Sequence, residues 1–386
     1  MSGLRTVAVD GSRAGIGALA TALDAAMNGG PAVLPLGPGA SVPAAASTPA
    51  GGAAVVIATS GSTGEPKLVA LSAAALRASA KATADRLGGP ARWLLALPAE
   101  HVAGVQVILR AHLAGAPPVV QDLRPGFRVD DFTAATAALG DGRRYTSLVP
   151  TQLLRVLDAG GPALDALRSY DAILVGGAAL EPGLRSRAVD AGARIVTTYG
   201  MSETCGGCVY DGVPLDGVVV DLDPDGRVLL GGPTLAEGYL GRPEETADTF
   251  VGGRFRTGDL GRFADGRLEI LGRADDVIIT GGEKIAPAAV ERVLAAQPGV
   301  RAVCVVGVPD PEWGQVVAAA VVWGADAAEG WVEPLRAAVR SELGRAAVPR
   351  RVISLPEIPV RGIGKPDRRA VAHLVTIDDG VIHSHG

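Results

Sequence analysis

The sequence is poor in cysteine, in long apolar runs and in leader-like features. Its 386 residues include only three cysteines, too few for the disulfide framework of a small secreted domain, so a reducing compartment fits. The longest uninterrupted apolar run that we find covers residues 316–323, far short of the roughly 20 residues that cross a bilayer. The start of the chain carries no charged-then-apolar signal sequence. These absences predict a soluble cytoplasmic protein without stable membrane insertion.

Lysine and excess positive charge are also scarce. The net charge is −5 and the sequence pI is about 5.6, so the chain has no basic footprint for nucleic acid. Only four of the 36 basic residues are lysine, at positions 67, 81, 284 and 365. In a chain that otherwise uses arginine, a remaining lysine indicates a need for a compact point charge. Lys67 and Lys365 lie in glycine-rich stretches and are candidate functional residues, whereas Lys81 lies in an alanine-rich helical pattern and is expected to be exposed.

The hydrophobic pattern predicts an α/β fold with more than one domain. A chain of this length exceeds what one core normally supports. Strand and helix patterns alternate over the first half of the chain, which is typical of a parallel sheet covered by helices. The expected strands cover residues 6–9, 53–58, 93–97, 146–149, 172–175 and 195–198, and the expected helices cover residues 14–27, 72–87, 102–114 and 130–139. Residues 28–50, rich in proline, alanine, glycine and serine, are expected to be a linker.

The second half of the chain changes pattern twice. Between residues 218 and 270, short strands with the turns Asp225-Gly226 and Asp265-Gly266 predict a small antiparallel β subdomain. The segment beyond it predicts a compact α+β domain of normal size. Its expected helices cover residues 286–296 and 332–343, and its expected strands cover residues 300–308 and 316–323. We therefore expect a large N-terminal domain at residues 1–274 and a small mobile C-terminal domain at residues 275–386, with Lys365 in a glycine-rich loop of the second.

The stretch from Thr59 to Lys67, TSGSTGEPK, directly follows the expected buried strand at 53–58. Its glycines let backbone N–H groups approach a ligand closely, and its hydroxyls and lysine suit phosphate oxygens. The order differs from a Walker A loop, because the lysine does not follow a glycine and Leu68 comes next instead of a serine or threonine. A flexible linker is the alternative, but a linker seldom follows a buried strand. The stretch therefore predicts a phosphate-binding loop of another kind.

Four later stretches place polar residues after expected strands or in loops. They are Gly176-Gly177-Ala178-Ala179, TTYGMSET at 197–204, RTGDL at 256–260 and GRADD at 272–276. In the second stretch the carboxylate of Glu203 is next to the hydroxyl of Thr204, a combination that suits a hard cation bound to phosphate. Taken alone, a residue such as Glu203 is most often a solvated carboxylate or a helix cap.

In this order along the chain, the loop, the four stretches and Lys365 resemble the adenylate-forming enzymes, a family of acyl-CoA synthetases, peptide-synthetase adenylation domains and luciferases. The resemblance covers nearly the whole chain; one departure is Leu68, where many members have glycine. It implies ATP, Mg²⁺ and coenzyme A as ligands. The residues that it implies for their binding are Thr59, Ser60, Gly61, Ser62, Thr63, Gly64, Lys67, Gly177, Ala178, Ala179, Thr198, Tyr199, Gly200, Met201, Ser202, Thr204, Asp259, Arg273, Gly281 and Gly282.

The resemblance also implies individual roles within the nucleotide site. Tyr199 would stack on the adenine ring, and Thr204 would contact the α-phosphate. Asp259 would accept both ribose hydroxyls, with Arg273 near the ribose. Asp275 would be the pivot of an interdomain hinge.

The candidate catalytic residues are Lys365, Lys67, Glu203 and His101, and the same resemblance implies the roles of the first three. Lys365 would bridge the carboxylate and the α-phosphate as charge develops, and Glu203 would hold Mg²⁺. The C-terminal domain would then rotate, remove Lys365 and bring in the loop at Gly281 and Gly282 for the thiol. His101 would gate the acid pocket or pair with a carboxylate; a packing histidine is the alternative.

The identity of the acid is indicated by two segments, residues 147–153 and 199–212, which resemble the o-succinylbenzoate–CoA ligases of menaquinone biosynthesis. The resemblance implies adenylation of o-succinylbenzoate and transfer of the acyl group to coenzyme A, giving AMP and pyrophosphate. Cys205 and Cys208 form C-x-x-C without a second pair for zinc, so we expect them to be small residues of the pocket wall.

Three alternatives stay open. The acid could be another aryl or fatty acid, the acceptor could be a separate carrier protein, or the chain could be a nucleotide-binding sensor without turnover. The intact set of five site residues argues against the sensor: Lys67, Glu203, Asp259, Arg273 and Lys365. A homodimer is compatible with each of these readings.

Overall fold

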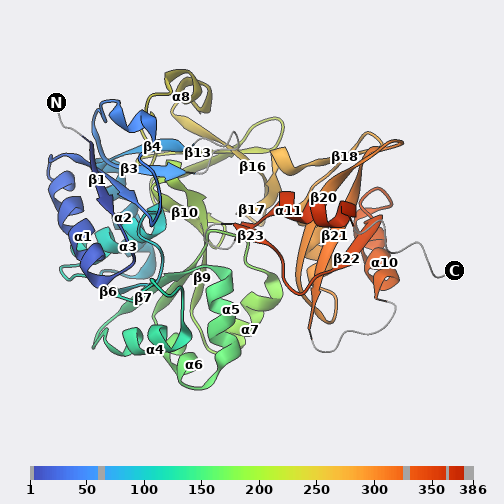
Figure 1. The fold of residues 1–386 in the computed structure, drawn as a ribbon, viewed down its shortest axis with the longest axis horizontal. Coiled ribbons are helices and arrows are strands. Elements are labelled where there is room, and N and C mark those ends of the chain that lie inside the picture. The colour runs from blue at the N-terminus through green and yellow to red at the C-terminus, as the bar shows by residue number, and fades with distance from the viewer. Residues whose placement is uncertain (1–3, 60–65, 325–330, 362–364, 378–386) are drawn as a thin grey trace.

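The structure, a computed structural model, describes residues 4–59, 66–324, 331–361 and 365–377, with only the backbone of Arg361 and Lys365. It is a mixed α/β protein with a large N-terminal domain and a small C-terminal domain, as the sequence predicts (Figure 1). The boundary at residues 274/275 stays a prediction. No helix in the described ranges has both the length and the apolar character needed to span a bilayer.

The first sheet of the N-terminal domain has five strands in the order β1-β2-β3-β4-β14. The pairs β1/β2 and β2/β3 are parallel, whereas β3/β4 and β4/β14 are antiparallel. Its elements, with helix α1, are β1 (Leu4–Ala8), α1 (Arg13–Met27), β2 (Ala32–Leu36), β3 (Ala53–Thr59), β4 (Lys67–Ser72) and β14 (Gly238–Tyr239). Thr59 and Lys67 are cross-strand partners, so β3 and β4 flank the predicted phosphate loop.

The expectation of a linker at residues 28–50 is wrong in part. Residues 32–36 form β2, an interior strand of this sheet, with four of the five residues buried, and 44–47 form a short 3-10 helix, η1 (Ala44–Ser47). The run AVLPL is apolar enough to enter the core despite its proline. The proline is tolerated because β2 pairs with β3 only at Val33 and Val55, so Pro35 needs no N–H toward β3.

The second sheet has seven strands in the order β11-β10-β9-β8-β7-β5-β6. The strands from β6 to β9 are parallel, and β10 and β11 extend the sheet as antiparallel strands. The strands are β5 (Arg92–Leu95), β6 (Val119–Val120), β7 (Arg144–Leu148), β8 (Ala172–Val175), β9 (Ile195–Met201), β10 (Gly206–Tyr210) and β11 (Val213–Pro214).

Helices cover both faces of this second sheet. On one face, α2 (Ala73–Leu87) and α3 (Val102–Leu113) share a hydrophobic core with the first sheet. On the other face lie α4 (Val129–Ala137), α5 (Pro150–Ala159), α6 (Gly161–Arg168) and α7 (Pro182–Asp190), drawn in green in Figure 1. Adjacent residues of β8 show the division, because Leu174 packs in the first core and Ile173 in the second. On α2, Lys81 pairs with Asp85 and is exposed, as expected.

An antiparallel subdomain completes the N-terminal domain, as the sequence predicts. It contains β12 (Val219–Leu222), β13 (Arg227–Gly231), α8 (Pro243–Thr249), β15 (Phe250–Val251), β16 (Arg254–Ala264) and β17 (Arg267–Arg273). Asp265 and Gly266 have φ angles of 49° and 72°, the left-handed pair that a two-residue hairpin turn requires. A 3-10 turn, η3 (Ala274–Asp276), follows β17.

The C-terminal domain is built on a five-stranded sheet in which β18 (Ile278–Thr280), β19 (Glu283–Ile285), β20 (Val300–Asp310), β21 (Gly314–Trp323) and β22 (Arg351–Ser354) pair. One face packs against α9 (Pro287–Ala295) and α10 (Val332–Leu343), and the other packs against α11 (Arg368–Ile377). A two-stranded ribbon of β23 (Val360–Arg361) and β24 (Lys365–Pro366) precedes α11.

Candidate active site

The candidate site lies where the parallel strands of the seven-stranded sheet end. Because β5, β7, β8 and β9 are parallel, the residues that follow them meet at one edge, the usual ligand-binding edge of an α/β sheet. His101 comes between β5 and α3, Gly177 follows β8, and Tyr199 lies near the end of β9. The fold therefore brings to one edge three predicted residues that lie far apart in the sequence.

Two glycines allow the backbone segments at this edge to approach closely. A Cβ atom on Gly176 would lie 2.3 Å from Oγ1 of Thr198, and one on Gly200 would lie 2.1 Å from the carbonyl oxygen of Gly206. No real Cβ makes contacts this short, so a larger residue at either position would displace β8, β9 or β10.

Tyr199, Asp259 and Arg273 form one hydrogen-bonded group. The hydroxyl of Tyr199 donates to Oδ2 of Asp259 at 2.8 Å, and Nη1 of Arg273 donates to Oδ1 at 3.4 Å. Asp259 and Arg273 are cross-strand partners on β16 and β17, and Gly258 leaves room for the guanidinium. Burial, and then the charge of Asp259, raise the pKa of Tyr199, so this phenol stays protonated and donates. A hydroxylated ligand such as ribose would join or replace these two donors.

A second group joins Lys67 to Glu203 through Tyr239. The hydroxyl of Tyr239 donates to Oε1 of Glu203 at 2.9 Å, and Nζ of Lys67 lies 4.9 Å from the centroid of the Tyr239 ring. Lys67 also forms an ion pair with Glu245 of α8, and this lysine lowers the pKa of that carboxyl group by its hydrogen bond. The phosphate-loop lysine and the candidate metal ligand therefore belong to one connected cluster.

The metal assignment fits the donors at Glu203. Among the described residues no group of three or more His, Cys, Asp or Glu could hold a metal ion. Mg²⁺ typically needs no such cage, because it binds through one or two carboxylates together with substrate phosphates and water. Glu203 is half-buried beside β9, with Oε1 oriented by Tyr239. A single oriented carboxylate suits Mg²⁺ that arrives with ATP.

Thr204 lies at the same place but faces the protein. It is fully buried, its Oγ1 accepts from the backbone N–H of Met201 at 2.9 Å, and the same oxygen lies 2.8 Å from the carbonyl oxygen of Gly206. The hydroxyl therefore fixes the turn η2 (Ser202–Thr204) after β9. Its contact with the α-phosphate stays a prediction.

Several predicted residues are described only in part. Ser60, Gly61, Ser62, Thr63 and Gly64 lie outside the described residues, as does the side chain of Lys365. Gly281 and Gly282 form the turn between β18 and β19, with φ angles of 56° and 85°. His101 is half-buried at the N-cap of α3 without a capping hydrogen bond from its side chain. The proposed roles of these residues stay predictions.

Two features of the cluster were not predicted from the sequence. Tyr239 and Glu245 lie outside the four recognised stretches, between the second and the third, and neither carries a local signal of function. Their partners Glu203 and Lys67 are 36 or more positions away, so only the tertiary fold brings them together.

Cys205 and Cys208 are fully buried free thiols, and burial raises the pKa of Cys208 to about 12.

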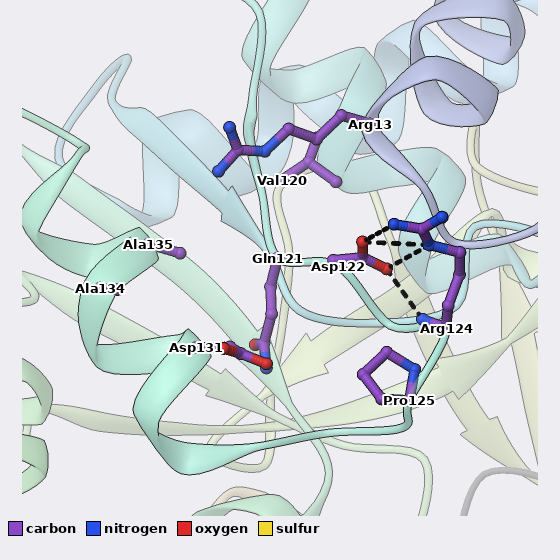
Figure 2. Close-up of a pocket in the computed structure, with 9 residues that line it drawn as sticks. All are labelled: Arg13, Val120, Gln121, Asp122, Arg124, Pro125, Asp131, Ala134 and Ala135. Atoms are coloured by element: carbon purple, nitrogen blue, oxygen red, sulfur yellow. Dashed lines mark hydrogen bonds and ion pairs between the residues drawn. The ribbon is translucent and has the colours of Figure 1, made fainter.

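A separate cavity of about 660 Å³ lies at the end of the edge strand β6 (Figure 2). It is lined by Arg13, Val120, Gln121, Asp122, Arg124, Pro125, Asp131, Ala134 and Ala135. In the order β9-β8-β7-β5-β6 this strand is four positions from β9, or roughly 19 Å at the usual strand spacing. None of the predicted site residues lines this cavity, so it is distinct from the candidate active site.

Comparison with known proteins identifies the family. The family described as AMP-binding enzyme matches residues 20–240, and the AMP-binding enzyme C-terminal domain matches residues 289–365. The chain is 47% identical over 322 residues to a probable 2-succinylbenzoate–CoA ligase of Mycobacterium tuberculosis (strain CDC 1551 / Oshkosh), covering 82% of this chain and 83% of that protein.

Solved structures give the same result. The o-succinylbenzoate CoA synthetase of Bacillus subtilis, in complex with its acyl-adenylate intermediate, matches with a TM-score of 0.72 and 27% identity over 84% of this chain and 70% of that one. That enzyme has also been solved with ATP and a magnesium ion. An amide bond synthetase of Marinactinospora thermotolerans matches with a TM-score of 0.75 and 33% identity, covering 90% and 76% of the two chains. This chain belongs to the AMP-binding enzyme family.

Proposed function

We propose that this chain is an ATP-dependent acid–thiol ligase that joins o-succinylbenzoate to coenzyme A, with release of AMP and pyrophosphate. The observation that carries the proposal is the connected cluster of Lys67, Tyr239 and Glu203 beside the group of Tyr199 and Asp259. The first cluster offers a cation and an oriented carboxylate for MgATP. The second offers an aromatic ring and an acceptor for the nucleoside. The 47% identity to a probable 2-succinylbenzoate–CoA ligase supports the choice of acid.

In the first half-reaction, a carboxylate oxygen of the acid attacks the α-phosphorus of ATP, and the bond to the leaving pyrophosphate breaks. Lys67 neutralises phosphate charge, Tyr199 and Asp259 orient the nucleoside, and Lys365 stabilises charge on the α-phosphate. When bound at Glu203, Mg²⁺ supplies further charge neutralisation on the phosphates. Gly176 and Gly200 allow the backbone segments that carry these groups to pack closely against Thr198 and Gly206.

In the second half-reaction, the thiolate of coenzyme A attacks the acyl carbon, and AMP leaves. The proposed C-terminal domain, residues 275–386, rotates about Asp275 between the two steps and exchanges Lys365 for the turn at Gly281 and Gly282. Two observations support a hinge there: Arg273 makes a long, exposed contact to Asp275 at 3.5 Å, and a single short turn, η3, joins β17 to β18.

The acid is tested with a panel of substrates. Pyrophosphate release from ATP and Mg²⁺ is measured with each of three acids: o-succinylbenzoate, benzoate and a medium-chain fatty acid. Each acid is tested with coenzyme A, with a simple amine and without an acceptor. We expect a CoA thioester from o-succinylbenzoate alone. Turnover of another acid, or an amide in place of the thioester, would overturn the assigned acid or the assigned acceptor respectively. A protein that binds ATP without turnover of any acid would be a sensor.

We also propose a cytoplasmic location, where ATP and coenzyme A are available and where three buried free thiols stay reduced. A homodimer is a hypothesis that sedimentation of the purified chain would test.

A further inference from the structure

Tyr239 reaches the candidate site by a two-residue strand added to the edge of the first sheet. β14 pairs with β4 in antiparallel register, with Tyr239 opposite Val69. Lys67 lies two residues before Val69 on β4, so it is on the same face of the sheet. Glu203, in contrast, follows β9 of the second sheet. Tyr239 is therefore placed between the two sheets that carry the lysine and the carboxylate.

The two ends of the Tyr239 side chain make different interactions. Its hydroxyl donates to Oε1 of Glu203 at 2.9 Å, while Nζ of Lys67 lies 4.9 Å from the ring centroid, within the range of a cation–π contact. The residue is only 7% exposed, so the ring has little freedom to leave this position.

Helix α8 holds Tyr239 from the other side. The hydroxyl of Thr246 accepts the backbone N–H of Tyr239 at 2.9 Å. Gly238 lets the helix come this close, since a Cβ atom there would lie 2.3 Å from Cγ2 of Thr246. The next residue back, Glu245, forms the ion pair with Lys67. Strand β14 and helix α8 thus fix the ring of Tyr239 beside the lysine.

We infer that Tyr239 is a positioning residue that orients Glu203 toward Mg²⁺ and, through its ring, sets the place of Lys67 for the phosphates of the same MgATP. This inference rests on the proposed function. The hydroxyl occupies Oε1 of Glu203 and restricts the side chain, which would leave the other carboxylate oxygen for the cation. Outer-sphere hydrogen bonds of this kind typically contribute about 10- to 100-fold to metal affinity.

The test separates the two ends of the side chain. Tyr239→Phe removes the hydroxyl and keeps the ring, whereas Tyr239→Leu removes both. Tyr170→Phe is the matched control, because the Tyr170 hydroxyl is also buried, lies 2.7 Å from Oγ1 of Thr136 and belongs to the other core of the domain. Binding of α,β-methylene-ATP is measured by calorimetry across a Mg²⁺ series, and binding of Mn²⁺ to the nucleotide complex is measured by electron paramagnetic resonance.

In Tyr239→Phe we expect the Mg²⁺ or Mn²⁺ concentration for half-saturation to rise by about tenfold, while nucleotide affinity at saturating metal changes by less than about twofold. Tyr239→Leu should weaken nucleotide binding at saturating metal as well, and Tyr170→Phe should match the wild type. Unchanged metal dependence in Tyr239→Phe would overturn the inference. If instead the wild-type chain binds no MgATP, the proposed function fails.

A measurement on the wild-type chain covers the case in which the Tyr239 variants do not fold. Addition of Mg²⁺ to the nucleotide complex should perturb the ultraviolet absorption of a buried tyrosine, and Glu203→Gln should abolish the perturbation while Tyr170→Phe retains it. The absence of any perturbation in the wild type would contradict the coupling.

Discussion

The hydroxyl of Tyr199 donates a 2.8 Å hydrogen bond to Oδ2 of Asp259, linking β9 of the seven-stranded sheet to β16 of the antiparallel subdomain. Asp259 is 9% exposed, and Arg273 supplies the second donor. The aromatic ring and the carboxylate assigned to the nucleoside are thus joined by a direct hydrogen bond. A bond that restricts both side chains lowers the entropy cost of ordering the site around ATP.

Removal of this bond should weaken ATP binding more than it slows chemistry. We expect Tyr199→Phe to raise KM for ATP by about fivefold, the effect of one hydrogen bond worth about 1 kcal/mol, with a smaller change in kcat. Asp259→Asn should have a larger effect, because it also removes the charge that faces Arg273. Steady-state kinetics at saturating acid measure both variants, with Tyr170→Phe as the control. An unchanged KM in both would show that the pair does not touch the nucleotide.

The ion pair between Lys67 and Glu245 should compete with ATP for the lysine. Both side chains are partly exposed, so the pair is worth little, and we expect Glu245→Gln to tighten ATP binding by about two- to fivefold. Glu244→Gln is the matched control, since Glu244 is the exposed neighbour on α8. Calorimetric titration with ATP at low salt measures the effect. Weaker binding in Glu245→Gln would mean that Glu245 holds Lys67 in its productive position.

Glu181 should make stability depend on pH. Glu181 precedes α7, and burial and the charge of Glu291 on α9 raise the pKa of its carboxyl group to about 6. The folded pKa is above the ordinary value of 4.5 because the fold disfavours the ionised carboxylate of Glu181. The contribution of Glu181 to the free energy of unfolding is therefore fully present below pH 4.5 and is lost as pH rises through 6. We expect calorimetry to give a Tm for Glu181→Gln about 2 °C above that of the wild type at pH 7.5, and no difference in Tm at pH 4.5. A gap of the same size at both pH values would contradict this account.

The three thiols should be unreactive in the folded protein. Cys205, Cys208 and Cys304 are all fully buried, and burial raises the pKa of Cys208 and of Cys304 to about 12. Since the thiolate is the reactive form, we expect Ellman's reagent at pH 8 to modify none of them until denaturant is added, and then all three. Rapid reaction of two thiols in the native protein would show that the segment around Cys205 opens to solvent.

Much of the fold follows from local pattern. The apolar run at 53–58 became β3, the strand at 172–175 has the same bounds as β8, and both Asp-Gly pairs lie in hairpin turns of the antiparallel subdomain. These features depend on periodicity and turn chemistry, which neighbouring residues determine. The helices α5, α6 and α7 were not predicted, although each has a proline in its first turn, a position typical of helix starts. Residues 32–36 were read as a linker because glycine, proline and alanine surround them.

The candidate site was predictable only where its residues lie in recognisable stretches. Tyr199, Glu203 and Asp259 belong to glycine-rich or polar motifs, and the fold brings them to one region. Tyr199 lies in β9, Glu203 follows β9, and Asp259 lies in β16. The sequence gives no sign of Tyr239 or Glu245, since their significance lies in contacts with Glu203 and Lys67 across the fold. Such contacts arise from the pairing of β14 with β4, and a strand of two residues is too short to be predicted from its sequence.

The most direct test of the central claim is isotope exchange between pyrophosphate and ATP, measured without coenzyme A. Because adenylation is the first half-reaction and is reversible, we predict exchange that depends on o-succinylbenzoate and Mg²⁺ and that is abolished in Lys365→Ala. Lys365→Ala should still convert supplied o-succinylbenzoyl-AMP to the CoA thioester at nearly the wild-type rate. Exchange that requires coenzyme A, or an equal loss of both half-reactions in Lys365→Ala, would contradict the two-step account.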